Sequence, residues 1–311
     1  MKPDPLKWMN HFKCLLLTSI LFFSQREVFA VDLAITMDDP MVEQSNEMSY
    51  QDVNEMILKT LADNHLKAFL FVCGKRVDTV QGKSILKAWD DQGHGLGDHS
   101  YSHLLFETPK MTLAKFISDV DRNDAILHGF RHRVPFFRFP FLHEGNTEEL
   151  RDGFRKYLHE HHLKNGYVTV DASDWYISER LVTAQKSGLK NLSKYRDYYI
   201  SHILNRVHYY DQLAQKVLGR SPKHTLLIHH NVLNALCLGD LIQALKKAGI
   251  KMINAQDAYL DPLAMESPEI VPAGQSLIWA LAKATGKFGS ELRYPGEDGD
   301  YQKAEMDSLG L

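Results

Sequence analysis

From residue 31 onward, short apolar runs of strand length alternate with longer stretches in which apolar residues recur at helical spacing. A chain with this alternation folds into consecutive β-α units, in which helices cover a sheet of parallel strands. Because parallel strands end at the same edge of a sheet or barrel, the side chains that follow them are expected to meet there. Seven strands are predicted, at residues 31–37, 68–72, 94–97, 136–139, 167–170, 225–228 and 251–254.

The first helix is predicted between the first two of these strands. Ser49 and Asp52 have the spacing of a capping box, in which side chains satisfy the free amides at a helix start. Apolar residues then recur along one helical face, at Val53, Met56, Ile57 and Leu61. We expect this face to pack on the sheet.

Residues 1–30 are expected to be a signal peptide. Three lysines precede an apolar run from Cys14 to Phe23, which is about half as long as a helix that spans a bilayer. Val28-Phe29-Ala30 then suits a signal peptidase. We therefore predict an exported protein, periplasmic or secreted, with no integral membrane domain after the signal is removed. A short membrane anchor or a buried helix is the alternative interpretation.

The rest of the chain is predicted to form one domain and an extension. A length of 311 residues suffices for a single large α/β domain, which we expect over residues 31–262. Residues 263–311 lose the periodicity and carry several prolines, which is typical of a C-terminal extension. Within the extension, residues 277–281 are expected to form a short helix that docks on the domain.

The composition argues against two classes of protein and against a disulfide framework. The formal net charge of -3 offers no basic surface for phosphates, so no nucleic-acid partner is expected. With 44% hydrophobic and 24% charged residues, the chain resembles globular proteins rather than membrane bundles. After removal of the signal, only Cys73 and Cys237 remain, and Cys73 lies in an apolar run. We expect two free thiols rather than a bridge.

The first strand ends in two adjacent carboxylates, Asp38 and Asp39. Like charges so close together resist joint ionisation, and the cost is tolerated where a cation neutralises them or where they face water. Taken alone, the pair could equally be a loop start or a helix cap. The third strand is followed by His99 and His103, which would share one face of a helical turn and could hold one zinc ion. Two histidines and one carboxylate leave a coordination position open, as in catalytic zinc sites.

Three further strands also end in polar groups. Arg138 stands among aromatic residues after the fourth strand, and a buried guanidinium requires a carboxylate partner from another strand end. Asp174 follows the fifth strand and His229 follows the sixth. Each residue alone has a structural interpretation as a cap or a hydrogen-bonded core group. Five of seven strands ending in ionisable groups at one edge favour a single functional site.

Five segments, in this order, resemble the motifs of the polysaccharide deacetylase family, carbohydrate esterase family four. The resemblance covers roughly residues 31–260, and the matching segments are 36–39, 99–103, 138–140, 171–175 and 227–229. It implies a distorted (β/α)7-type barrel, in agreement with the strand count, so the domain at residues 31–262 is expected to be catalytic. The implied activity is the metal-dependent hydrolytic removal of N-acetyl groups from an N-acetylated polysaccharide or oligosaccharide.

The resemblance also implies roles for individual residues. A divalent ion, with zinc expected, would be held by Asp39, His99 and His103. Asp38, paired with Arg138, would be the general base that takes a proton from the attacking water. The backbone amide of Phe141 would stabilise the oxyanion, although the family commonly has tyrosine at this position.

On the other side of the substrate, His229 would protonate the leaving amine, and Asp174 would hold His229 in its charged form. Trp175 and Leu227 would line the pocket for the acetyl methyl group. The adjacent His230 makes the choice of acid ambiguous, but spacing from Leu227 favours His229. Two alternatives stay open: a hydrolase of another amide or cyclic imide on the same fold, and a non-catalytic sugar-binding relative.

Overall fold

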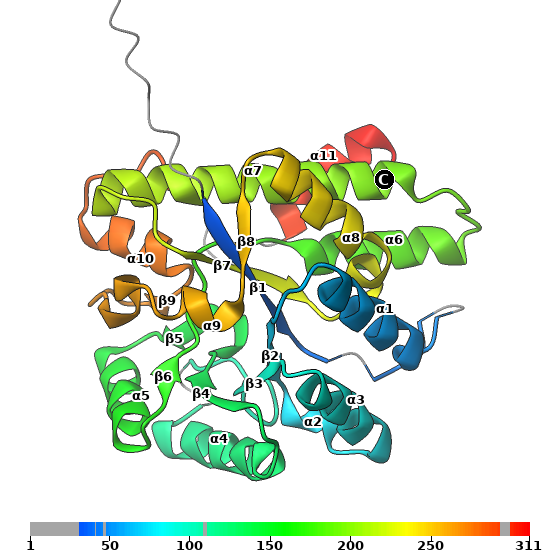
Figure 1. Cartoon of the computed structure of the whole chain (residues 1–311). Helices are drawn as coiled ribbons and strands as arrows, with labels where there is room; N and C mark the ends of the chain where they lie inside the picture. The colour runs from blue at the N-terminus through cyan, green and yellow to red at the C-terminus, as the bar shows by residue number, and fades with distance from the viewer. Residues whose placement is uncertain (1–30, 41, 46–47, 108–110, 293–298) are drawn as a thin grey trace, which may run out of the picture.

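The computed structural model describes residues 31–311 apart from 41, 46–47, 108–110 and 293–298 (Figure 1). The predicted signal peptide at residues 1–30 lies outside the described residues. Among those that are described, seven strands form one sheet in the order β6-β4-β3-β2-β1-β7, with β8 also paired to β1. Every pairing in this sheet is parallel. The predicted fold class, a distorted (β/α)7-type barrel in a single domain, is confirmed.

The strands of the main sheet are β1 (Asp32–Asp38), β2 (Phe69–Val72), β3 (Gly95–Asp98), β4 (Arg133–Phe137), β6 (Lys164–Asn165), β7 (His224–His229) and β8 (Lys251–Ile253). Two short strands, β5 (His143–Gly145) and β9 (Ala273–Gly274), pair with each other in antiparallel fashion. The longer helices are α1 (Tyr50–Asp63), α3 (Val80–Asp91), α4 (Leu113–Leu127), α5 (Glu148–Glu160), α6 (Asp174–Lys186), α7 (Ser193–Leu218), α8 (Val232–Lys247), α10 (Leu277–Ala284) and α11 (Gly299–Leu309). Short helical turns are α2 (Gly74–Val77), η1 (Pro140–Leu142), α9 (Ala255–Ala258) and η2 (Pro262–Met265).

Strand β1 pairs with three strands, β2, β7 and β8, and is buried from Leu33 to Asp38. Its run of apolar residues is what a strand covered on both faces requires. Helices surround the curled sheet on its outer side, and the long helix α7 runs across one end of the molecule (Figure 1). The register between β1 and β7 pairs Thr36 with Leu227 and Asp38 with His229. This register brings the ends of both strands to the same edge of the sheet.

The prediction of a strand at residues 167–170 is wrong. Only Val170 forms an isolated bridge, with Leu226. Threonine hydroxyls replace the regular ladder here: Thr225 Oγ1 donates to the carbonyl of Tyr167 and accepts from the amide of Thr169. Such side-chain bonds compete with the backbone pairing of a strand. The segment still occupies the space between β6 and β7, and Leu227 N donates to Val170 O.

The other strands are present with shifted ends, most clearly β4, which begins three residues before the predicted start at residue 136. The capping box of α1 is confirmed, because Ser49 and Asp52 each accept from the other's backbone amide. The inner face of α1 differs from the prediction in one position. Met56 is exposed, and Leu58 is buried in its place.

The predicted short helix in the C-terminal segment is present as α10, which packs against α7. Cys73 and Cys237 are buried free thiols, as predicted. Within the described part of the chain, no helix combines the length and the apolar character needed to cross a membrane.

Candidate active site

The end of β1 directs two adjacent carboxylates to different neighbours. Asp38 is the last residue of the strand and is almost fully buried. Asp39 has a φ of 55°, a left-handed conformation that few residues other than glycine adopt. Its amide still donates to Phe71 O, so the chain turns sharply at this point. As a result, Asp38 faces Arg138, whereas Asp39 faces His103.

Arg138 is completely buried and all of its polar groups are engaged. Its Nη1 donates to Asp38 Oδ1 at 2.6 Å, and Nη2 donates to Thr36 Oγ1 and to the hydroxyl of Tyr259, both at 2.9 Å. Nε donates to Gly166 O at 2.8 Å. Burial raises the pKa of Asp38, and the adjacent guanidinium of Arg138 opposes that rise. The partner that the sequence required for a buried arginine is therefore Asp38.

The two histidines lie on a loop after β3, and the prediction that they share a helical turn is wrong. Ser100 and His103 have left-handed φ values of 63° and 53°. Hydrogen bonds hold this loop: Asp98 Oδ1 accepts from Ser100 N, and Ser100 Oγ accepts from His103 N. Left-handed residues other than glycine cluster at functional sites, where the surroundings hold the strain.

His99 is set up as a neutral ligand. Its Nδ1 lies 2.8 Å from the carbonyl oxygen of Arg138, and a carbonyl only accepts, so Nδ1 carries the proton. Nε2 is then the unprotonated nitrogen, which carries a free lone pair, and it lies 3.6 Å from Asp38 Oδ2. Burial, together with the neighbouring His103, lowers the pKa of His99 to about 3. The contact with Asp38 is therefore not an ion pair at neutral pH.

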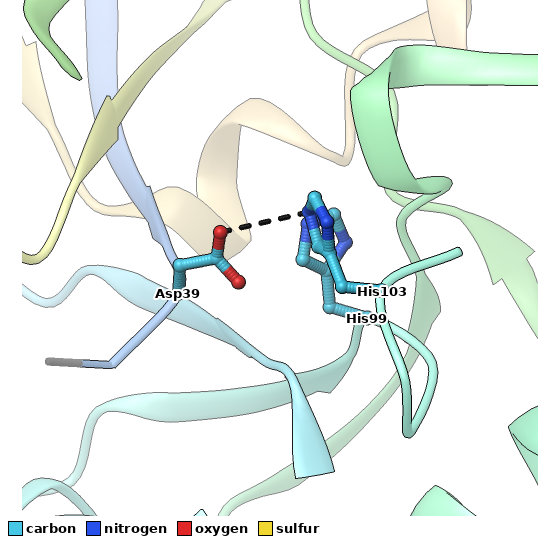
Figure 2. Close-up of side chains that lie close together, drawn as sticks. All are labelled: Asp39, His99 and His103. Atoms are coloured by element: carbon cyan, nitrogen blue, oxygen red, sulfur yellow. Dashed lines mark ion pairs between the residues drawn. The ribbon is translucent and has the colours of Figure 1, made fainter. Parts of the chain in front are cut away.

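Asp39, His99 and His103 offer three ligand atoms that all lie within 4.8 Å of one another. Figure 2 shows both imidazole rings on the same side of the Asp39 carboxylate, with His103 Nε2 3.5 Å from Asp39 Oδ2. Asp39 Oδ1 is buried and has no hydrogen-bond partner among the described residues; its nearest cation is Arg76, whose Nε is 3.4 Å away. A carboxylate oxygen without a donor beside two imidazoles fits a divalent cation such as zinc.

His229 and Asp174 form a second dyad at the end of β7, where His229 is the register partner of Asp38. Asp174 has no exposed surface, and its Oδ1 lies 2.8 Å from His229 Nδ1. Its Oδ2 accepts hydrogen bonds from His229 N and from the side-chain amides of Asn231 and Asn234. Burial alone would lower the pKa of His229, but the charge and hydrogen bond of Asp174 outweigh it and raise that pKa to about 9. His229 is therefore protonated at neutral pH.

Leu142, Val168 and Leu227 form a small apolar cluster, and Leu227 lies in β7 two residues before His229. Leu142 follows Phe141, whose exposed ring contacts the ring of His103 at a centroid distance of 4.6 Å. Trp175, predicted to line the same pocket, is not a member of this cluster. It lies in the first turn of α6, next to Asp174 in the chain.

Several residues that support the site were not predicted. Tyr259 hydrogen-bonds Arg138 across 121 positions, and no local pattern predicts such a contact. Asn231 and Asn234 are different, because they follow His229 closely and begin α8. Their position beside a predicted catalytic histidine was an available signal. His230 turns away from the dyad, is buried, and lies 3.2 Å from Asn54 Oδ1 through its Nε2.

The sequence model described as polysaccharide deacetylase matches residues 31–160. Over this segment, the chain is similar to the polysaccharide deacetylase family. No curated protein sequence matches the chain significantly.

Similar solved structures show the same fold. A mutant of a pseudoenzyme of carbohydrate esterase family four superposes with a TM-score of 0.52 at 17% identity, covering 74% of this chain and 67% of that one. The wild-type pseudoenzyme, from Bacillus anthracis, gives 0.50 at 17% identity, covering 74% and 66%. A mutant of it with restored enzymatic activity gives 0.50 at 19% identity, covering 74% and 68%. The chain therefore spans about two thirds of the length of these structures.

Proposed function

We propose that this protein hydrolyses the N-acetyl groups of an N-acetylated glycan. The observation that carries the proposal is the convergence, at one sheet edge, of a possible cation site, a buried carboxylate paired with an arginine, and a histidine paired with a buried aspartate. A metal site alone would serve binding or structure. A base and an acid on opposite sides of it are what amide hydrolysis requires.

Asp39, His99 and His103 would hold a divalent ion, most simply Zn²⁺. When bound, such an ion polarises the acyl oxygen and lowers the pKa of an attacking water. Asp38 accepts the proton of that water through the oxygen that Arg138 does not occupy. Arg138, with its hydrogen bonds to Thr36, Tyr259 and Gly166, fixes the orientation of this carboxylate. The backbone amide of Phe141 donates to the developing oxyanion.

His229 donates a proton to the leaving sugar amine as the carbon-nitrogen bond breaks. Its raised pKa of about 9 keeps it protonated before the reaction, and Asp174 holds Nδ1 so that Nε2 faces the substrate. Leu227 would form the apolar surface for the acetyl methyl group together with Leu142 and Val168, its partners in the apolar cluster. Trp175, which lies outside that cluster, would border the same pocket. We also propose that the protein is exported, with residues 1–30 as its signal peptide.

The experiment that tests this function is acetate release from N-acetylglucosamine oligomers by the purified protein. We expect about one equivalent of divalent ion per chain, loss of acetate release on chelation, and recovery when zinc is restored. The matched variant is Asp38→Asn, which should keep the ion but lose about 10²–10⁴-fold in rate, because it removes only the base. Full activity of Asp38→Asn would contradict the assigned base.

A non-catalytic sugar-binding role is the second candidate, because similar folds include a pseudoenzyme. Binding without turnover would leave the oligomers intact under every metal condition. Retention of both Asp38 with its arginine and His229 with its aspartate favours catalysis, since binding alone needs neither dyad.

A further inference from the structure

Residues 273–277, in the C-terminal segment, lie directly against the apolar cluster of the site. Gln275 N donates to Leu142 O and Leu277 N donates to Val168 O, both at 2.7 Å. Ser276 Oγ donates to Thr169 O at 2.8 Å. Two of the three cluster residues, Leu142 and Val168, therefore have their backbones tied to a segment more than a hundred positions later in the chain.

The turn that carries Leu142 needs such a tie. Phe141 and Leu142 both have a φ of 56°, and two consecutive left-handed residues other than glycine are strained. A residue in such a conformation persists only when its surroundings hold it. The pairing of β9 with β5 and the hydrogen bond from Gln275 N are the contacts that hold this turn.

Gly274 is the residue that allows the close approach. Its φ is +114°, and a Cβ atom added there would lie 1.9 Å from Leu142 O and 2.9 Å from Glu144 N. Both neighbours are backbone atoms, so relief requires a shift of the strand or of the turn. Any larger residue at position 274 would displace Leu142.

There is almost no room behind the apolar cluster. Leu142 and Val168 also line a cavity of about 20 Å³, together with Tyr167, Gln275 and Leu277. A cavity of that size holds about one water molecule. The side chains of the cluster therefore cannot shift away from a bound acyl group unless residues 273–277 move.

We propose that residues 273–277 fix the wall formed by Leu142 and Val168, and so limit the hydrolysed acyl group to the size of an acetyl. Gly274 is thus a positioning residue that acts through Leu142. This inference rests on the proposed function and extends it to acyl specificity.

The test compares N-formyl and N-acetyl glucosamine oligomers as substrates of the wild type and of Gly274→Ala. The formyl-to-acetyl ratio of kcat/KM is expected to rise about tenfold in the variant, the range of one methylene in a hydrophobic pocket. The formyl-to-acetyl ratio should rise whichever way Leu142 moves. If the pocket narrows, it excludes the methyl group of the acetyl substrate, and if the pocket loosens, that methyl group loses its packing contacts. The formyl group has no methyl, so neither change weakens its binding in this way.

The matched control is Gly286→Ala, because Gly286 also has a left-handed φ of +70° but nothing lies within 4 Å of an added Cβ. The formyl-to-acetyl ratio of Gly286→Ala should equal that of the wild type. Ser276→Ala removes only the hydrogen bond to Thr169 O and should raise the formyl-to-acetyl ratio about threefold. If Gly274→Ala does not fold, Ser276→Ala tests the inference in its place. An unchanged ratio in Gly274→Ala, or an equal rise in Gly286→Ala, overturns the inference. A wild type that releases neither acid contradicts the proposed function instead.

Discussion

Asp39 and Asp174 are carboxylates of the same site with opposite surroundings. Asp174 is completely buried and accepts four hydrogen bonds, from His229 N and Nδ1 and from the side chains of Asn231 and Asn234. Asp39 has one buried oxygen without a donor, and its contacts with His103 and Arg76 are longer than good hydrogen bonds. The hydrogen bonds of Asp174 are thus all supplied by the protein, whereas Asp39 keeps one carboxylate oxygen that a bound cation would satisfy.

The largest effect is expected from His103→Ala, which breaks the ligand side alone. Loss of one of three ligands should abolish stable ion binding, and acetate release should fall by more than about 10³-fold because several kcal/mol of charge stabilisation disappear. Metal content after dialysis and acetate release measure the two effects. His229→Ala is the control, since it should lose activity and keep the ion. A His103→Ala protein that retains one tightly held equivalent would refute the ligand assignment.

An intermediate effect is expected from Asp174→Asn, which removes the charge of the acid side and keeps its shape. The pKa of His229 should fall from about 9 toward its ordinary value of 6.5. His229 must be protonated to donate, so the alkaline limb of the pH profile should move down, with a loss of roughly 10–100-fold at pH 8. Asn231→Ala keeps the Asp174 charge, so the alkaline limb of its pH profile should stay near the wild-type position. If the alkaline limb of Asp174→Asn does not move either, His229 is not the acid.

The same dyad should affect stability. Because the pKa of His229 is higher in the folded protein than its ordinary 6.5, the dyad stabilises the fold fully below pH 6.5. That contribution is lost as the pH rises through about 9. Thermal unfolding of Asp174→Asn and the wild type should therefore differ most in the acid part of this window and converge above it.

The smallest effect is expected from Tyr259→Phe, which removes one hydrogen bond to Arg138 and one to Tyr167 O. Arg138 keeps its bonds to Asp38 and Thr36, so kcat should fall only about 3–10-fold with KM unchanged, and stability by about 1–2 kcal/mol. Tyr209→Phe is the control, because its hydroxyl donates to the remote Glu291 O. Equal kinetic losses in the two variants would remove Tyr259 from the support of the base.

Much of the fold was predictable from local patterns. Strands β1 and β2 are largely continuous apolar runs, and the capping box of Ser49 and Asp52 begins α1 as expected. The segment at residues 167–170 has the same apolar character but fails as a strand, because Thr169 and Thr225 bond each other's backbones through their hydroxyls. That competition depends on which strand lies opposite, and a single stretch of sequence does not contain this information.

The sequence alone determined which groups stand at the strand ends, since period and order place Asp38, Asp39 and His229 after buried strands whatever the details of packing. The tertiary structure alone decided how these groups are supported: the left-handed turns at Asp39 and His103, the bond from Tyr259 to Arg138, and the approach of Gly274 to Leu142. The physical reason is the separation in sequence between the residues involved. The periodicity of a strand depends on neighbouring residues, whereas these hydrogen bonds and close contacts depend on partners that only the folded chain brings together.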